Sequence, residues 1–399
     1  MSLPRVLMLV HSYCPADPRV RREAEGLVAA GYRVDVLCLR DRGQRWQERV
    51  AGVRYLRLPL RRRRGGLLRY AFEYCMICGV GSLAVGALYG AQRYRLVQVH
   101  NMPDFLVFAT LVPWFAGVPV LLDLHDPVPE LYESKFGLGR DSLLIRLLTR
   151  IEGASVAFAD AVLAATGAFR RRLLERGRPA DRIRVVLNSP DPGLFEAAPP
   201  RPEAVGEARL LFHGTVTRRS GVDLAVLAAE RVRKGGLAVR FTILGDGDYL
   251  PVIREMVAQE GRREWVEVRG PVPLEDIPAE VAGCDLGIVP NRGGAFSDLA
   301  LPTRLFEYLG TGRPVAVSRS PAIQDLFGEE DLLFFDPGSL EDMVRVVGNA
   351  LGDANLRQHM VERGGKIYEA HSWEKECAGY LDVVRRLTGS REEAGRRES

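Results

Sequence analysis

The stretch from Leu301 to Val315 combines residues that could bind a phosphorylated ligand. Pro302 and Thr303 open a short amphipathic helix, and Thr303 is predicted to cap its N-terminus. The unpaired N–H groups and the positive dipole end of a helix N-terminus attract anions, so this end suits a diphosphate. Glu307 lies one turn deeper on the same face, where its carboxylate can accept hydrogen bonds from both hydroxyls of a ribose. A surface helix with one solvated glutamate is the alternative interpretation.

Further segments of the second half follow predicted strands and could contact the same ligand. Glycine lets the backbone approach a ligand closely, and arginine can neutralise a diphosphate. The Gly245-x-Gly247 pattern is half of a dinucleotide fingerprint and is weak evidence, because the third glycine is missing. The segments are His213 to Thr215 with Gly214, then Arg218 and Arg219, Gly245 to Gly247, Gly270 to Val272, and the loop from Asn291 to Leu301, which contains Asp298.

Polar residues also follow two predicted strands of the first half. His100 and Asn101 end one of these strands and His125 follows the other, so both histidines are expected to face a ligand. A polar residue at a strand end is otherwise only a turn former. Asp17 is predicted to cap a helix that begins at Pro18, and a contact of Asp17 and Arg19 with a substrate is the alternative.

Short β-branched runs alternate with helical patterns along the chain, which indicates α/β domains with parallel sheets. A proline-rich linker near residue 200 divides the alternation in two. We therefore expect two doubly wound, Rossmann-like domains facing across a cleft, at 1–195 and 205–370. A helix at about 372–388 should pack back on the first domain, and 390–399 should form a disordered tail. The predicted strands are 6–10, 34–39, 53–58, 96–100, 118–123, 161–165, 183–187, 209–213, 238–244, 265–269, 286–290, 315–318 and 332–335.

The charge of the chain is unevenly distributed. The net charge is +4 over 399 residues, but residues 1–100 hold 18 arginines, no lysine and seven acidic side chains. Such a basic half implies an anionic partner, either a membrane surface or a phosphorylated substrate. Nucleic acid is the weakest candidate, because no nucleic-acid-binding motif accompanies the arginines.

One apolar segment, residues 71–90, is long enough to raise the question of a membrane span. It contains Glu73 and four glycines, so a helix packed against a sheet is the favoured interpretation. Arg61–Arg64 and Arg69 precede it, and they fit either attachment to an anionic leaflet or a solvated loop. The six cysteines lie mostly in apolar runs, and the N-terminus runs directly into a predicted strand; both features favour a cytoplasmic protein without a signal peptide.

Three of these segments together resemble the GT-B glycosyltransferases of family 4, the retaining, metal-independent group. They are residues 17–24, 212–219 and 301–308, and the likeness extends over nearly the whole chain. The resemblance implies transfer of a hexosyl-type sugar from a nucleotide diphosphate sugar, with no metal or other cofactor. It also implies a saccharide or lipid-linked acceptor from cell-envelope or exopolysaccharide synthesis. The expected location is the cytoplasm, peripheral to the inner face of the membrane.

The resemblance assigns roles to individual residues. Glu307 matches the second glutamate of the family's E-x7-E pair, which binds the donor ribose, whereas the first falls at Leu299 and is missing. Asp298 or backbone amides then replace it. The family's arginine and lysine for the diphosphate fall at Thr215 and Ser220, so Arg218 or Arg219 must substitute. The assigned residues are His125, Arg219 and Glu307 for catalysis; Gly214, Thr215, Arg218, Gly245, Val272, Asp298, Leu301, Pro302, Thr303 and Arg304 for the donor; and Asp17, Arg19, His100 and Asn101 for the acceptor.

The implied mechanism is a front-face displacement, in which the leaving phosphate takes the acceptor proton. Arg219 and the helix that begins near Thr303 would stabilise the charge that develops on that phosphate. Two alternatives remain open, a nucleotide-sugar 2-epimerase of the same fold and a non-catalytic scaffold for envelope assembly. A nicotinamide-dependent enzyme is disfavoured, because residues 11–15, after the first strand, contain no glycine.

Overall fold

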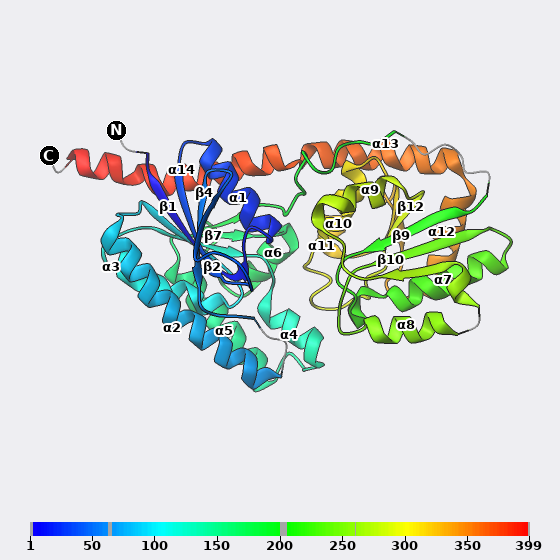
Figure 1. The fold of residues 1–399 in the computed structure, drawn as a ribbon, viewed down its shortest axis with the longest axis horizontal. Coiled ribbons are helices and arrows are strands. Elements are labelled where there is room, and N and C mark those ends of the chain that lie inside the picture. Colours follow the sequence, from blue (N-terminus) through cyan, green and yellow to red (C-terminus); the bar gives the residue numbers. More distant parts are fainter. Residues whose placement is uncertain (1–2, 63–65, 200–205, 260, 398–399) are drawn as a thin grey trace. The chain divides into compact units, whose positions relative to one another are not determined.

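The computed structural model describes residues 3–62, 66–199, 206–259 and 261–397 (Figure 1). The chain divides into two compact units. Unit 1 comprises Met1–Leu187 and Glu376–Ser399, and unit 2 comprises Asn188–Lys375. Each unit is an α/β fold built on its own sheet, as the alternation of strand and helix patterns predicts.

The sheet of unit 1 has eight strands in the order β3-β4-β2-β1-β5-β6-β7-β8. All neighbouring pairs are parallel except β3 with β4. The strands are β1 (Arg5–Tyr13), β2 (Arg33–Leu39), β3 (Gln47–Val50), β4 (Val53–Leu58), β5 (Leu96–His100), β6 (Val120–Leu124), β7 (Ala161–Ala164) and β8 (Ile183–Val185). The helices are α1 (Pro18–Ala29), α2 (Leu67–Ala91), η1 (Asp104–Thr110), α3 (Leu111–Phe115), α4 (Val128–Phe136), α5 (Leu143–Phe158), α6 (Gly167–Glu175) and α14 (Trp373–Arg397).

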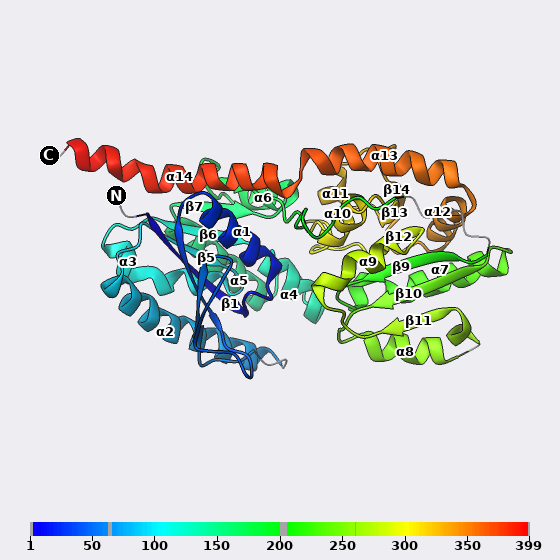
Figure 2. The ribbon, with the colours of Figure 1, turned by 45° about the horizontal axis from the view of Figure 1, so that its top comes forward.

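Helices cover both faces of this sheet. Met8 of β1 is fully buried in a cluster with Tyr380 and Val384 of α14, whereas Gly81 of α2 faces Leu9, the next residue of β1. Because neighbouring residues of a strand point to opposite faces, α14 and α2 lie on opposite sides of the sheet (Figure 2). Strands β5, β6 and β7 are buried along their whole length, as a sheet covered on both faces requires.

Unit 2 contains a six-stranded, wholly parallel sheet in the order β11-β10-β9-β12-β13-β14. Its strands are β9 (Ala208–His213), β10 (Val239–Leu244), β11 (Val266–Arg269), β12 (Leu286–Val289), β13 (Val315–Ser318) and β14 (Leu333–Phe335). Its helices are η2 (Arg218–Ser220), α7 (Val222–Lys234), α8 (Leu250–Ala258), η3 (Arg262–Glu264), η4 (Leu274–Asp276), α9 (Ile277–Ala282), α10 (Thr303–Gly310), α11 (Pro321–Gln324), α12 (Leu340–Gly352) and α13 (Ala354–Ala370).

Three local features differ from the sequence-based expectation. Strand β3 was not predicted, because it is a polar edge strand with no buried residue. Residues 104–115 form η1 and then α3 instead of one helix, since Pro113 has no N–H to continue an α-helical ladder. Residues 390–397, expected as a disordered tail, continue α14.

Candidate functional site

Two glycine-containing loops meet at the carboxyl ends of β9 and β10. Gly214 donates its N–H to the carbonyl of Leu244 at 2.9 Å, and Gly245 has a φ of +140°. A Cβ on Gly245 would lie 1.9 Å from the carbonyl oxygen of Gly214, so no other residue fits there without a shift of the backbone. The glycine pattern therefore serves the contact between two loops. It leaves Gly214 and Thr215 exposed at the end of β9.

Helix α10 begins one residue earlier than a Thr303 cap requires. The N-cap is Pro302, which has extended backbone angles, and Thr303 is the first helical residue. The hydroxyl oxygen of Thr303 accepts a hydrogen bond from Asn188 Nδ2 at 3.0 Å. The expectation that Thr303 caps the helix is therefore wrong, because Pro302 already holds the non-helical conformation of an N-cap. The amides at this helix end remain without a side-chain cap.

Glu307 lies one turn into α10, against the end of β9. Its side chain is 14% exposed, and its Oε2 lies 3.5 Å from Nε2 of His213. Burial and the nearby charge of Arg304 lower the pKa of His213 to about 3. His213 is therefore neutral at pH 7, and its contact with Glu307 is not an ion pair. The contact with His213 thus leaves the negative charge of Glu307 intact, and an ionised carboxylate accepts hydrogen bonds from ligand hydroxyls.

Arg304, expected to contact the donor, lies beside the loop of Gly214. Its guanidinium carbon is 4.5 Å from the ring centroid of Phe212, and a Cβ on Gly214 would meet a guanidinium nitrogen at 2.8 Å. Burial lowers the pKa of Arg304, although the group stays charged. Its positive charge accounts for part of the lowered pKa of His213.

Arg218 and Arg219 lie in η2, directly after the loop of Gly214. Arg219 is half-buried, and its guanidinium carbon lies 4.7 Å from the ring centroid of Phe296, whereas Arg218 is exposed. Ser220 occupies the position of the family's lysine. It is buried, and its hydroxyl is engaged by the backbone of Thr217 in a capping box. Ser220 is thus unable to contact a phosphate, which leaves the two arginines as the cations of this segment.

The loop that leads into α10 explains why the first glutamate of the pair is absent. Leu299, at the position of that glutamate, is 6% exposed and belongs to the apolar interior. Asp298 next to it is half-buried, and its carbonyl accepts a hydrogen bond from the N–H of Ala322. Val272, Leu301 and Pro302 are also half-buried.

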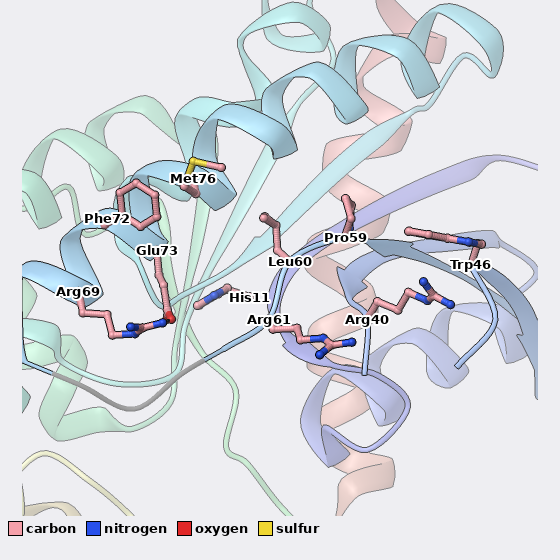
Figure 3. Close-up of a pocket in the computed structure, with 10 residues that line it drawn as sticks. All are labelled: His11, Arg40, Trp46, Pro59, Leu60, Arg61, Arg69, Phe72, Glu73 and Met76. Atoms are coloured by element: carbon pink, nitrogen blue, oxygen red, sulfur yellow. Dashed lines mark ion pairs between the residues drawn. The ribbon is translucent and has the colours of Figure 1, made fainter. Parts of the chain in front are cut away.

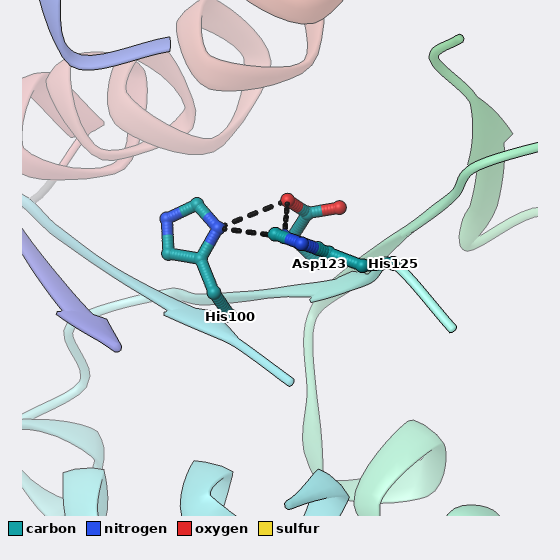
Figure 4. Close-up of side chains that lie close together, drawn as sticks. All are labelled: His100, Asp123 and His125. Atoms are coloured by element: carbon teal, nitrogen blue, oxygen red, sulfur yellow. Dashed lines mark hydrogen bonds and ion pairs between the residues drawn. The ribbon is translucent and has the colours of Figure 1, made fainter. Parts of the chain in front are cut away.

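In unit 1, two histidines and an aspartate meet at the ends of β5 and β6 (Figure 4). Oδ2 of Asp123 lies 2.7 Å from Nε2 of His125 and 3.0 Å from Nδ1 of His100. The two imidazole nitrogens are 3.1 Å apart. Asp123 and His100 are fully buried, whereas the side chain of His125 is 19% exposed. Only His125 of this cluster is therefore accessible to a ligand in unit 1.

A chain of buried polar groups supports this cluster. Arg19 donates to both carboxylate oxygens of Asp123, at 3.0 and 2.5 Å, and to Glu23 at 3.1 Å. Glu23 accepts from Gln98 at 2.6 Å, and Gln98 accepts from the hydroxyl of Tyr380 at 2.6 Å. The network connects α14 through β5 and α1 to β6. Buried hydrogen bonds of this kind fix side-chain positions, because each broken bond leaves a buried polar group unpaired.

The network sets the protonation of its members. Burial disfavours the charged form of Asp123, but Arg19 first and then His125 hold the pKa of this carboxyl well below its usual range. Burial also works against a charged His100, yet its hydrogen bond to Asp123 and the charge of Glu23 raise the pKa of His100. Asp123 is therefore a permanent anion that orients both imidazoles.

The structure changes the interpretation of the predicted acceptor-side residues. His100 and Arg19 were expected to face a ligand, but they are 0% and 4% exposed and support Asp123 instead. Asp17 caps α1, as predicted, by accepting the N–H of Val20. Asn101 is buried, and its Oδ1 accepts the N–H of His125 at 2.8 Å. Burial of charged pairs depends on tertiary neighbours, which a local pattern does not reveal.

Sequence reasoning assigned no individual role to four residues of these two clusters. They are Glu23, Gln98, Asp123 and Tyr380. A signal exists for Gln98, a polar residue inside the apolar run from Leu96 to Val99. A buried polar residue of this kind needs a hydrogen-bond partner, so its place in an apolar run already indicates a polar network.

The cluster of His100, Asp123 and His125 also has the composition of a metal site, because one ligand atom from each lies within 4.8 Å of the others. The distances between Nδ1 of His100, Nε2 of His125 and Oδ2 of Asp123 are those of ordinary hydrogen bonds. Arg19 already bonds both oxygens of Asp123 and puts a positive charge beside the candidate site. The residues therefore fit a hydrogen-bonded group better than a cation site.

A cavity of about 510 Å³ lies beside the N-terminal half of α2 (Figure 3). Glu73 and Arg69 of α2 form a pair at 3.6 Å on one side, and the guanidinium of Arg40 stacks on Trp46 at 3.9 Å. Burial, and then the charge of Arg62, lower the pKa of His11 to about 4, so His11 is neutral. The lining residues are His11, Arg40, Trp46, Pro59, Leu60, Arg61, Arg69, Phe72, Glu73 and Met76.

Comparison with known families decides the class of the protein. Residues 16–189 match a glycosyl transferase 4-like domain, and residues 207–353 match glycosyl transferases group 1. The chain belongs to the GT-B glycosyltransferases of the family 4 type. The expected family and fold are thereby confirmed.

Relatives of this glycosyltransferase act in the synthesis of different products. The chain is 25% identical to the amylovoran biosynthesis glycosyltransferase AmsK of Erwinia amylovora over 159 residues. This alignment covers 40% of the chain. The chain spans about two fifths (39%) of the length of that relative. It is 24% identical over 352 residues to the 2-deoxystreptamine glucosyltransferase of Streptomyces kanamyceticus, covering 85% of this chain and 83% of the relative.

A solved structure shows the same fold over nearly the whole glycosyltransferase. Anabaena HepE in complex with UDP-glucose aligns with a TM-score of 0.70 at 15% identity, over 96% of this chain and 99% of that chain. At this identity the likeness concerns the fold alone.

Proposed function

We propose that this glycosyltransferase moves a hexosyl group from a nucleotide diphosphate sugar to a saccharide or lipid-linked acceptor, with retention of the anomeric configuration. The observation that carries the proposal is the carboxylate of Glu307, one turn inside α10 and beside a neutral His213. The membership of the family supports the reaction class.

Unit 2 would bind the donor. Glu307 would accept hydrogen bonds from the ribose hydroxyls, while the amides at the start of α10 and the guanidinium of Arg219 contact the diphosphate. Arg218, which is exposed, is the second candidate for the diphosphate. Backbone groups of Gly214, Gly245 and Val272, with Asp298, would line the remainder of the donor site.

Unit 1 would supply His125 and the acceptor contacts. Asp123 accepts from Nε2 of His125, so the lone pair of Nδ1 is available for a hydroxyl of the donor sugar. Arg19, Glu23 and His100 would act through Asp123 as positioning residues.

The bond between the anomeric carbon and the phosphate oxygen breaks as the acceptor oxygen bonds to the same face of that carbon. The acceptor proton passes to the leaving phosphate oxygen, so no protein base is required. Positive charge from Arg219 and the dipole of α10 would stabilise the departing diphosphate in place of a metal ion. We therefore propose that transfer needs no metal or other cofactor.

The proposed location is the cytoplasmic face of an anionic membrane, where a lipid-linked acceptor would be found. Arg61 and Arg62 precede α2 and Arg69 lies in its first turn, where they could contact anionic headgroups. Arg63 and Arg64, predicted to take part, lie outside the described residues.

Substitution of Glu307 tests the donor site. Glu307→Ala should lower kcat/KM by ten- to a hundredfold or more, because charge-assisted hydrogen bonds to the ribose are worth roughly 1.5–3 kcal/mol. The rate of nucleotide release from UDP-, GDP-, ADP- and dTDP-sugars measures kcat/KM. The control is the Glu341→Ala variant, whose side chain is exposed. Wild-type kinetics in Glu307→Ala would refute the donor site. Epimerised donor without transfer would favour the 2-epimerase, and no turnover of any donor would favour the scaffold.

A further inference from the structure

Helix α2 is apolar on the side that faces solvent. From residue 71 to 91 its only charged residue is Glu73, which is largely buried. The exposed positions follow one stripe along the helix, and the stripe contains no charge. Phe72 is 66% exposed, Met76 39% and Leu83 78%, and Gly79 and Ala87 continue the stripe. An ordinary surface helix carries polar residues at such positions.

The opposite stripe of α2 holds the helix on unit 1. Ile77 and Val85 are fully buried, and Gly81 allows the helix backbone to approach Leu9 and Ala109. The segment 69–91 is long enough for a membrane span, and it contains an 18-residue window with a mean hydropathy of 1.6, of which 17% is buried. If α2 crossed a membrane, Ile77 and Val85 would have to leave the core of unit 1. The helix is therefore positioned to lie along a membrane and not to cross it.

The apolar stripe continues onto α3. A Cβ on Gly86 would lie 3.5 Å from Val112, so α3 packs directly against the C-terminal half of α2. Val112 is 53% exposed and Phe115 78%, and Trp114 beside them is 37% exposed. The membrane face is defined here as the outer side chains of both helices: Phe72, Met76, Leu83, Leu111, Val112, Trp114 and Phe115.

Arginines stand at both ends of α2. Arg61, Arg62 and Arg69 precede or begin the helix, and the exposed Arg93 and Arg95 follow it. Arg61 and Arg69 line the cavity beside α2, together with Phe72 and Met76 of the membrane face (Figure 3). An uncharged apolar stripe between cations complements the acyl chains and anionic headgroups of a membrane leaflet.

We propose that the membrane face inserts into the outer acyl region of an anionic leaflet, with α2 lying parallel to the bilayer. Arg61, Arg69 and Arg93 then contact the lipid phosphates. The inference deepens the proposed function, on which it rests for the lipid-linked acceptor. It adds apolar insertion to the electrostatic attraction that the basic first hundred residues already predict.

Sedimentation with vesicles tests the proposal on the full chain. We expect the wild type to pellet with vesicles of phosphatidylcholine containing phosphatidylglycerol, and to pellet much less with phosphatidylcholine alone. The double variant Leu83→Asp, Phe115→Asp should bind at least tenfold more weakly, because it puts charges into the acyl region. The matched control is Val252→Asp, on an exposed apolar position of α8 in unit 2, and it should bind like the wild type.

A second measurement reports insertion of the wild-type chain itself. Lipids brominated along their acyl chains should quench the fluorescence of Trp114, and Trp114→Phe should abolish most of that quenching. Binding should also persist in part at 0.5 M NaCl, where electrostatic attraction alone is screened. Quenching of Trp114 in the wild type supports insertion even if the double variant fails to fold.

Two results of the vesicle assay would overturn the proposal: the wild type stays in the supernatant with anionic vesicles, or the double variant binds as the wild type does. A third is that the wild type binds no vesicles but forms a dimer, and that Leu83→Asp dissociates this dimer. The last would assign the face to a second copy of the chain. Nucleotide release from soluble donor is measured without vesicles, so a wild type that releases nucleotide but does not bind anionic vesicles contradicts the membrane face alone. Vesicle binding without release from any donor contradicts the transferase activity instead.

Discussion

At the scale of single residues, the site is built on carboxylates whose neighbours control their availability. The imidazole beside Glu307 is neutral and leaves the charge of this carboxylate intact, whereas Asp123 is fully engaged by Arg19 and two imidazoles. Both arrangements depend on buried histidines with opposite pKa shifts. Burial dominates in His213 and lowers its pKa, and the carboxylates around His100 raise the pKa of that residue.

The lowered pKa of His213 predicts a loss of stability in acid. The pKa is about 3 in the folded protein against 6.5 for the ordinary group, so below pH 6.5 the unfolded chain binds the additional proton. Stability is thus fully present above pH 6.5 and falls as the pH drops towards 3. At pH 5 one such group costs about 2 kcal/mol.

Chemical denaturation at pH 7 and pH 5 measures this loss. His213→Gln, which keeps a polar side chain without a titration in this range, should lose about 2 kcal/mol less than the wild type between the two pH values. Equal losses in both proteins would contradict the assignment of a buried neutral imidazole to position 213.

At the scale of elements, the carboxyl ends of the parallel strands collect the polar residues of each unit. Loops after β9 and β10 present Gly214 beside α10, and β5 and β6 bring His100 and Asp123 together. This is the edge at which doubly wound sheets bind ligands.

We expect nucleotide release to survive EDTA, because the cluster on β5 and β6 does not suit a metal ion. Arg19 occupies both oxygens of Asp123, so His100, Asp123 and His125 have no vacant carboxylate for a cation. Nucleotide release should therefore be unchanged after chelation and dialysis. A loss of release that added Mn²⁺ or Zn²⁺ restores would contradict the metal-independent mechanism.

The strands were predictable from sequence, but the partners of the polar residues were not. The run Leu96–His100 matches β5 because apolar, β-branched residues fit a sheet covered on both faces, and Val53–Leu58 matches β4 because apolar and polar residues largely alternate along it. Glu307 and His125 could be proposed from the sequence because each lies in a short local motif. The burial of Arg19 was missed, since its partner Asp123 is 104 residues away in the chain. The role of Tyr380 requires α14 to pack on β5, which no local pattern encodes.

At the scale of the whole molecule, the chain comprises two α/β units that both match glycosyltransferase families. The charge separation seen in the sequence has a structural counterpart, because arginines of the first hundred residues lie at the ends of an exposed apolar helix in unit 1. Donor chemistry would belong to unit 2, and acceptor and membrane contacts to unit 1.

The anomeric configuration of the transferred sugar tests the central claim most directly. Time-resolved proton NMR of the reaction with the donor that shows nucleotide release gives the coupling constant of the anomeric proton in the first product. An α-configured donor should yield an α-linked product, because the acceptor attacks the face from which the diphosphate leaves. A β-linked first product would contradict the retaining transfer proposed for this protein.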